Sequence, residues 1–332
     1  MVSQRVRVAL ILVKLLLVLP TEAFNARMPP VLMDLCSILR SNSQDSRDAT
    51  RKTLAEICTL TGPSAFGFVV KELRSALPMG VHLHVLSYTV HSILESTKDI
   101  FRPGDLDYCI SSIVAVIMDD TFGVPGLEKE AEEYRSRRRE VKSSRSFDSM
   151  ELIAQNTSLS HLSELITPIR MLLLERLDDR MMQKINELLR RIGLGIMHNA
   201  SAQDQQVLMF CYEVIKDVYN ASSQSAGTDG PQNPKLKRYL VIMKNANKTG
   251  NRGAQSSQIG RLVRFALDVL RMVLRRHDIL RTPANLKQFM PIVGDAIVSR
   301  DEDVQISAIR LLTSILDVPL VQIAKDAEVY AA

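Results

Sequence analysis

Two segments far apart in the chain carry the same pattern of residues, and this repetition constrains the fold more than any other feature. MPPVLMDLCSILRSNSQDSRDATRKTLAEI begins at Met28, and MPIVGDAIVSRDEDVQISAIRLLTSI begins at Met290. In each, a proline-started apolar helix ends in a polar turn, after which Asp45 or Asp303 is expected to cap a second helix. The recurrence predicts helical hairpins of about 40 residues, which bury their apolar faces only by stacking on neighbouring hairpins.

Composition agrees with helices packed on helices. The chain of 332 residues is 46% hydrophobic and only 5% aromatic, and its Leu, Ile, Val and Met residues recur in blocks separated by short polar breaks. No segment shows the sustained alternation expected of a strand. We therefore predict an all-α fold, an α-solenoid of HEAT/armadillo-like helical hairpins, with a generic helical bundle as the alternative.

Two stretches are expected to interrupt the array. Residues 127–149 form a highly charged insertion, and residues 222–258 are rich in Gly, Ser and Asn and are expected to be largely disordered. Both insertions are expected to be exposed. The remaining blocks, 1–126, 150–221 and 259–332, are expected to hold HEAT-like repeats, and the last block includes a basic helix.

The opening 24 residues, MVSQRVRVALILVKLLLVLPTEAF, could be a signal peptide or a repeat helix. We favour the repeat helix, because Lys14 interrupts the apolar run and the stretch leads directly into a predicted hairpin. Its packing face is expected to consist of Leu12, Leu15, Leu16 and Leu19. The run is too short and too charged to span a bilayer, so no membrane association is expected. An apolar helix at the start of a stack indicates a piece of a longer array.

Signatures of catalysis are missing from the sequence. It contains no phosphate loop, dinucleotide-binding glycine fingerprint, nucleophile elbow or HExxH motif, so no enzyme activity, cofactor or small-molecule substrate is expected. Gly193 and Gly195 are better explained by close helix packing. Four widely spaced cysteines, with no paired histidines, predict buried free thiols rather than disulfides or a metal site. These are Cys36, Cys58, Cys109 and Cys211.

Positive charge is concentrated in one region. The net charge is +5, but the stretch from Lys235 to Arg281 holds twelve Lys or Arg against two Asp, a local charge of +10. On the predicted helix 259–276, a narrow basic stripe lies opposite an apolar face of Val263, Leu267, Leu270 and Leu274. The stripe consists of Arg261, Arg264, Arg271 and Arg275.

Such a stripe could hold RNA phosphates, or it could simply be a solvated face. Two further basic clusters are candidates for RNA contact. One contains Lys235, Lys237 and Arg238. The other contains Arg137, Arg138 and Arg139, and its alternatives are a nuclear address or a soluble spacer.

The order of these elements is familiar. The run SQDSRDATRKTLAEICTLTGPSAFGFVVKELRSALPMGVHLHVLSYTVHSIL, then DLDYCISSIVAVIMDDTFG and SRSFDSMELIAQ, resembles the DRIM (down-regulated in metastasis) family. That family comprises very large HEAT-repeat scaffolds of the small-subunit processome, the nucleolar U3 snoRNA particle. The likeness covers most of the chain and extends to the closing MPIVGDAIVSRDEDVQISAIRLLTSILDVPL.

The resemblance implies a non-catalytic scaffold in ribosome biogenesis that supports 18S rRNA processing and small-subunit assembly in the nucleolus. The implied partners are pre-ribosomal RNA and proteins of the U3 particle. Because family members are far longer, the chain is expected to be an internal fragment of the array. The competing interpretation is a karyopherin-like or other HEAT-repeat adaptor that binds protein cargo.

Overall fold

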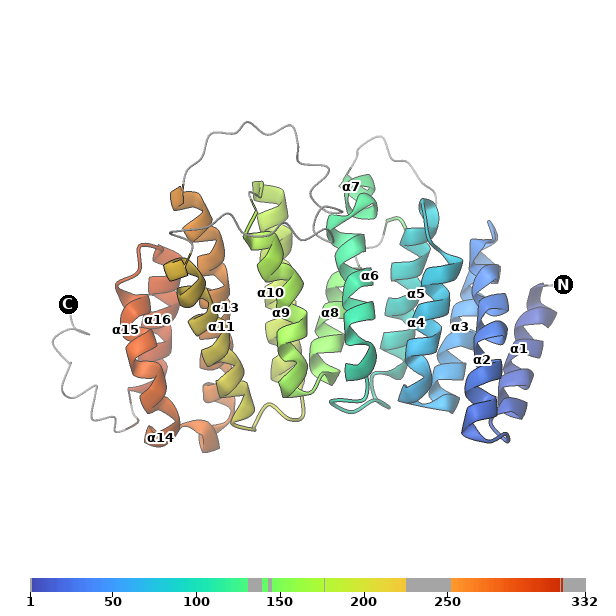
Figure 1. Ribbon diagram of the computed structural model, residues 1–332, viewed down its shortest axis with the longest axis horizontal. Coiled ribbons are helices and arrows are strands. Elements are labelled where there is room, and N and C mark those ends of the chain that lie inside the picture. The colour runs from blue at the N-terminus through green and yellow to red at the C-terminus, as the bar shows by residue number, and fades with distance from the viewer. Residues whose placement is uncertain are drawn as a thin grey trace. The chain divides into compact units, whose positions relative to one another are not determined.

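The computed structural model describes residues 2–130, 139–142, 145–175, 177–224, 252–316 and 318, and within these ranges the chain forms helices and turns but no strand (Figure 1). The predicted all-α class of stacked helical hairpins is confirmed. The chain divides into two compact units, Met1–Thr157 and Ser158–Ala332.

The first unit stacks its helices in two layers. It contains α1 (Val2–Leu16), α2 (Thr21–Ser37), α3 (Gln44–Thr61), α4 (Phe66–Ala76), α5 (Val81–Thr97), α6 (Ile110–Phe122), α7 (Val124–Glu130) and α8 (Arg145–Asn156), with short 3-10 helices η1 (Ile38–Arg40), η2 (Pro63–Ala65) and η3 (Asp107–Cys109). One layer runs through α1, α3, α5 and α8, each contacting the next, and the other runs through α2, α4 and α6. This alternation is the geometry of a helical repeat array.

The second unit is built around its longest helix. It contains α9 (Leu162–Leu173), α10 (Asp179–His198), α11 (Gln206–Gln224), α13 (Arg252–Arg276), α14 (Pro283–Leu286), α15 (Met290–Ile297) and α16 (Glu302–Ile315), with 3-10 helices η4 (Leu159–His161), η6 (Asp278–Leu280) and η7 (Lys287–Phe289). Helix α13 contacts α10 on one side and α16 on the other, and α11 packs against it. The row α10, α13, α16 therefore forms one layer of this unit.

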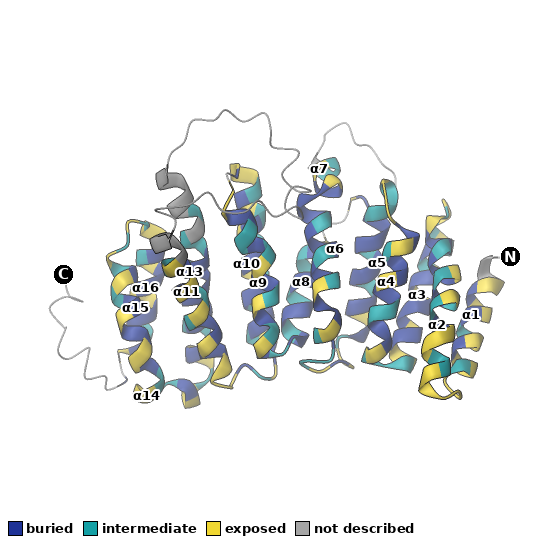
Figure 2. Cartoon of the chain, viewed as in Figure 1, coloured by how far each residue is buried: buried dark blue, intermediate teal, exposed yellow. Residues whose placement is uncertain are grey.

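Apolar side chains fill the space between the helices of each unit (Figure 2). The four cysteines are buried and unpaired, as predicted. Burial raises the pKa of Cys58 and of Cys211 to about 12, so these thiols stay protonated at neutral pH and are poor nucleophiles.

The two repeats share the polar turn and the capped second helix, but the caps lie two residues earlier than predicted. The prediction that proline starts the first helix is confirmed for α15 and wrong for α2, where Pro29 and Pro30 lie inside the helix. Helix α3 is capped by Ser43, whose hydroxyl accepts a hydrogen bond from the Ser46 amide, and α16 is capped by Asp301. Asp45 and Asp303 instead lie in the first turns of these helices. A capping side chain accepts a hydrogen bond from the second or third backbone amide of the helix, so its residue must directly precede the first turn. Ser43 and Asp301 hold this position in the two repeats.

Helix α1 packs through the face opposite to the one predicted. Val6, Ala9 and Val13 are buried against α2 and α3, whereas Leu12 and Leu15 are 43% and 61% exposed. The helix is apolar on both sides, so its hydrophobic pattern alone did not specify which side faces the stack. A different segment, Asp107–Lys129, is long and apolar enough to cross a membrane, but 61% of its window is buried inside the protein, as in a core helix.

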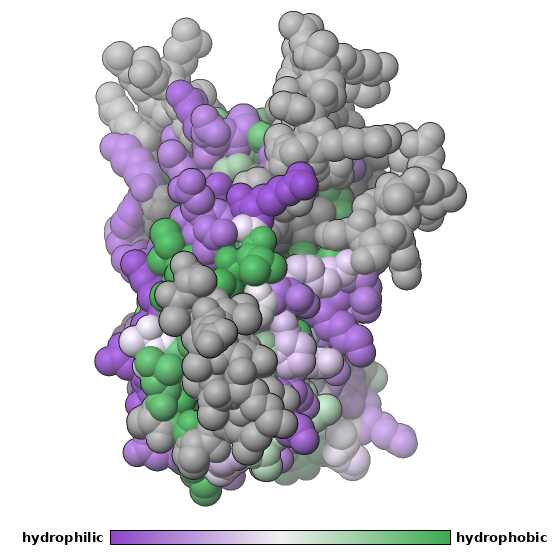
Figure 3. Space-filling model, turned by 90° about the vertical axis from the view of Figure 1, so that its left-hand side faces the viewer, coloured by the Kyte–Doolittle hydropathy of each residue, from purple (hydrophilic) through white to green (hydrophobic). Residues whose placement is uncertain are grey.

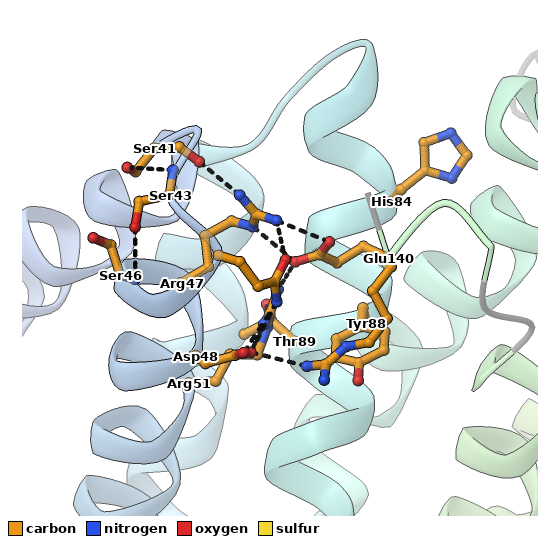
Figure 4. A network of polar contacts seen from close by, with 12 residues as sticks. Ser41, Ser43, Ser46, Arg47, Asp48, Arg51, His84, Tyr88, Thr89 and Glu140 are labelled. Carbon is orange, nitrogen blue, oxygen red and sulfur yellow. Dashed lines mark hydrogen bonds and ion pairs between the residues drawn. The ribbon is translucent and has the colours of Figure 1, made fainter. Parts of the chain in front are cut away.

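Glu140 and Val141 of the charged insertion are buried, contrary to the expected exposure, whereas Arg139 and Lys142 are exposed as expected. Glu140 is 1% exposed and lies against α3, where it accepts hydrogen bonds from Arg47 and Arg51 (Figure 4). The guanidinium of Arg47 also donates to the Ser41 carbonyl. A carboxylate can be buried here because two arginines neutralise it and supply its hydrogen bonds.

Candidate nucleic-acid interface

The basic helix of the sequence analysis corresponds to α13, and its apolar face lies where predicted. Val263, Leu267, Leu270 and Leu274 are all buried, with exposures of 2% or less. The arginine stripe lies on the other side of the helix, along grooves that separate α13 from α10 and from α16. The outer surface of the layer α10, α13, α16 therefore carries the predicted cations.

Arg261 and Arg264, in the first half of the stripe, are held by neighbouring helices. Arg261 Nη1 donates a 2.9 Å hydrogen bond to Asn186 Oδ1 on α10, and Arg264 Nη1 lies 2.7 Å from Asp303 Oδ2 on α16. Asp268, one turn along α13, lies 3.8 Å from Arg264 Nε. Carboxylates thus compensate the charge of Arg264, and this part of the stripe attracts anions less than its sequence suggests.

The groove between α10 and α13 has a volume of about 470 Å³ and is mixed in charge. Arg261, Arg264 and Arg271 line it together with Asp268 and Glu187. Hydrogen bonds from Arg190, and secondarily from Arg191, outweigh the effect of burial and lower the pKa of Glu187 to about 2. The groove therefore keeps Glu187 ionised at neutral pH and contains a second carboxyl group in Asp268, which weakens its attraction for a polyanion.

The groove between α13 and α16 is different, because its lining contains four arginines and no carboxylate. It has a volume of about 460 Å³. Its arginines come from α13, from the residue that follows η6 and from α16. They are Arg271, Arg275, Arg281 and Arg310, and the remaining lining residues are Ile309, Thr313 and Ser314. We call this groove the four-arginine pocket.

Two arginines of the four-arginine pocket are fixed at its edge and two project from it. The chain reverses after α13 through η6, and Arg281 Nη2 donates a 3.1 Å hydrogen bond to the Ser314 carbonyl on α16. Arg271 Nη2 lies 4.0 Å from Asp268. Arg275 and Arg310 are exposed, and within the described ranges neither forms an ion pair. These two cations face solvent without a protein counterion.

Sequence reasoning found Arg271 and Arg275 but missed Arg281 and Arg310. The reason is that these two arginines come from other elements, and a single helical wheel cannot bring them together with α13. The sequence does single out Arg310, because it is the one basic residue of the second helix predicted for the repeat that begins at Met290. Two aligned basic positions on consecutive helices of an array would have suggested a shared groove.

Of the other predicted RNA-binding residues, the structure describes Arg139. Arg139 belongs to the first unit, where it lies 2.9 Å from Asp48 and stacks its guanidinium over Tyr88 at 5.1 Å. Arg139 precedes the buried Glu140 in the chain, and Figure 4 shows its partners Asp48 and Tyr88 near Glu140. The remaining candidates, Arg137, Arg138, Lys235, Lys237 and Arg238, lie outside the described residues.

Comparison with known proteins gives a consistent set of relatives. A family model described as "U3 small nucleolar RNA-associated protein 20 domain" matches residues 1–215. The curated U3 small nucleolar RNA-associated protein 20 of Schizosaccharomyces pombe is 37% identical over 334 residues, and that of Saccharomyces cerevisiae is 35% identical over 325 residues. The alignments cover 100% and 95% of this chain but only 13% of either relative.

Among solved structures, two engineered proteins align with this chain at 14% identity. One alignment covers 86% of this chain and 96% of the engineered protein with a TM-score of 0.27, and the other covers 97% and 81% with a TM-score of 0.19. Scores this low carry no argument about fold or function.

Proposed function

Because the chain belongs to the U3 small nucleolar RNA-associated protein 20 family, which is the DRIM family of the sequence resemblance, we propose that it forms part of a non-catalytic scaffold of the small-subunit processome. In this role it supports 18S rRNA processing and small-subunit assembly in the nucleolus. The names of both relatives refer to association with U3 snoRNA, which favours this role over a karyopherin-like adaptor.

The observation that carries the proposal is the basic layer of the second unit. Stacked helices offer a long surface for assembly, and the stripe from Arg261 to Arg275 spans about 21 Å along α13 at 1.5 Å per residue. A row of cations on such a surface attracts RNA phosphates without regard to sequence. The proposed partners are pre-ribosomal RNA and proteins of the U3 particle.

The chain spans 13% of the length of the two curated relatives. We propose that it is an internal segment of a longer array, in which a further helical hairpin covers the outward face of α1. Val8, Ile11 and Leu15 on that face are 52%, 57% and 61% exposed. Helices inside an array are packed on both sides, and α1 has the two apolar faces that such a position requires. The division into repeat blocks 1–126, 150–221 and 259–332, separated by insertions at 127–149 and 222–258, belongs to the same proposal.

Affinity purification tests the proposed function. The full-length family protein that carries this segment is tagged in cells, and the RNA and proteins that co-purify are identified. Recovery of U3 snoRNA, pre-ribosomal RNA and many assembly factors is the expected result. Recovery of a small GTPase with peptide cargo, and no ribosomal precursor, would support the adaptor instead.

A further inference from the structure

We infer that the four-arginine pocket between α13 and α16 holds a phosphate of an RNA backbone, and that this pocket, rather than the predicted stripe as a whole, is the anion-binding centre of the second unit. The inference rests on the proposed function for the identity of the polyanion. Arg281 and Arg310 are new members of the site, and Arg264 is excluded from it.

Charge balance separates the two grooves of the layer. Glu187 and Asp268 line the groove between α10 and α13, so an incoming phosphate would meet like charge there. The four-arginine pocket has no carboxylate in its lining. The nearest acids to its arginines are Asp268, 4.0 Å from Arg271, and Asp278, 3.4 Å from Arg281. Four cations against two peripheral carboxylates leave an excess of positive charge.

The guanidinium groups also have unused hydrogen-bonding capacity. Each arginine has five N–H donors arranged in a fork that matches phosphate oxygens. Arg271 Nε has no acceptor within the part of the chain that the structure describes, and Arg275 and Arg310 extend into solvent. Arg281 is fixed by its hydrogen bond to the Ser314 carbonyl, so one side of the pocket is rigid before a ligand arrives. A preorganised cation loses less conformational entropy when it binds.

The lining of the pocket specifies the kind of contact. It contains no aromatic side chain on which a base could stack, and its apolar part is Ile309, which is 52% exposed. Recognition by guanidinium groups alone reads the backbone and not the bases. Most of the described surface seen in Figure 3 is hydrophilic, with separate apolar patches. An acidic peptide would also satisfy the charge, and we favour RNA because the names of both relatives refer to association with a small nucleolar RNA.

Binding of a fluorescein-labelled single-stranded RNA to the full chain, followed by anisotropy over a range of KCl concentrations, tests the inference. Arg275→Gln and Arg310→Gln alter the pocket without removing any ion pair of the described residues. Each substitution is expected to weaken binding about tenfold and to lower the slope of log affinity against log salt by about 0.7. The matched controls Arg264→Gln and Arg190→Gln remove a surface arginine from the mixed-charge groove and should change affinity less than twofold.

Circular dichroism establishes that each variant is folded. An equal loss of RNA affinity in all four variants would show that binding depends on net charge and not on the four-arginine pocket. Unchanged RNA affinity in Arg275→Gln and Arg310→Gln would overturn the assignment of phosphate binding to the pocket. A polyglutamate peptide that binds with the same dependence on Arg310 would overturn the assignment to RNA. Inorganic phosphate at millimolar concentration should compete only weakly, because a single small anion lacks the adjoining phosphates that add to the attraction of a polyanion.

The two proposals can fail separately. Absence of U3 snoRNA from the RNA that co-purifies with the tagged protein would refute the processome role, whatever the RNA affinity of the isolated chain. Intact co-purification combined with unchanged RNA affinity in the pocket variants would refute the pocket alone.

Discussion

Glu140 and Arg47 form a buried ion pair that joins the charged insertion to the core of the first unit. Arg47 Nε lies 2.7 Å from Glu140 Oε1, and the two side chains are 2% and 0% exposed. Arg51, one turn further along α3, donates to the same carboxylate. The pair is separated by 93 residues in the sequence, so it fixes the end of a segment that would otherwise have little apolar surface to bury.

Removing the charge of Glu140 should destabilise the first unit. Among the described residues, Glu140→Gln leaves Arg47 buried without a counterion and leaves Arg51 paired with the partly exposed Asp48. Breaking a buried pair costs about 3 to 5 kcal/mol in comparable sites. Amide hydrogen exchange of peptides from α3 and α5 should be faster in Glu140→Gln than in the parent protein under native conditions. Glu56→Gln, which removes an exposed carboxylate from the same helix α3, is the matched control. Equal protection of α3 in the parent and in Glu140→Gln would contradict this account.

The same pair should make the stability of the first unit depend on pH. Burial alone would raise the pKa of Glu140, but the hydrogen bond from Arg47 and the charge of Arg51 outweigh it and lower the pKa to about 2. Because the folded pKa is below the unfolded value of 4.5, the stabilisation is fully present above pH 4.5 and is lost as pH falls toward 2. It amounts to about 3 kcal/mol at neutral pH. The stability difference between the parent and Glu140→Gln should therefore shrink across this interval in urea titrations, and a constant difference would exclude the linkage.

Gly193 should tolerate alanine. It is buried in the contact between α10 and α13, as the sequence predicted, but an added Cβ would lie 3.5 Å from Met272 Cε and from Val269 Cγ2, which is ordinary packing distance. Alanine is favoured over glycine inside a helix by about 1 kcal/mol. Gly193→Ala is expected to raise the thermal unfolding temperature, and a fall would show that the two helices cannot accommodate a methyl group.

Gly67 should not tolerate the same change. An added Cβ would lie 2.7 Å from Tyr108 Cε2, so the ring would have to move. The Tyr108 hydroxyl accepts from the Gly67 amide and donates to the Pro63 carbonyl, both at 2.8 Å. Gly67→Ala is expected to reduce stability by about 1 kcal/mol through loss of these bonds. Tyr108→Phe, which removes only the hydroxyl, should reproduce most of this loss in urea unfolding, and a much smaller effect would assign the cost to the ring.

Neutralising Asp303 should strengthen RNA binding. Asp303 compensates Arg264 at 2.7 Å, and its removal leaves Arg264 with Asp268, 3.8 Å away, as its remaining counterion among the described residues. Asp303→Asn is expected to raise RNA affinity about threefold at low salt, and the gain should disappear at high salt as charges are screened. Glu302→Gln removes one negative charge from the same first turn of α16 and serves as the control. An equal gain in both variants would indicate a response to net charge rather than to Arg264.

The sequence predicted those features of the fold that depend on neighbours along the chain. The repeated hairpins and the apolar face of α13, with Leu267 and Leu274 at its centre, follow from helical periodicity and were found in the structure. The caps were predicted two residues too late. In each repeat two residues that cap helices well stand two positions apart, Ser43 and Asp45 in one and Asp301 and Asp303 in the other, so the sequence did not distinguish them.

Features that depend on contacts between distant segments could not be predicted in this way. Helix α1 has two apolar faces, and only its contact with α2 and α3 decides that Val13 is buried and Leu15 exposed. Glu140 lies in a run of charges whose composition predicts exposure, and its burial depends on two arginines of α3. The four-arginine pocket likewise forms only when η6 and α16 are brought beside α13.

Contact between RNA and the surface of α13 and α16 is the central claim, and ultraviolet crosslinking tests it most directly. U3-containing particles carrying the full-length family protein would be irradiated and digested, and the peptides joined to RNA would be located by mass spectrometry. We predict crosslinked peptides within 261–281 and 302–315, the segments that supply the four-arginine pocket. Intact particles whose crosslinks lie only on other segments of the protein would contradict the claim.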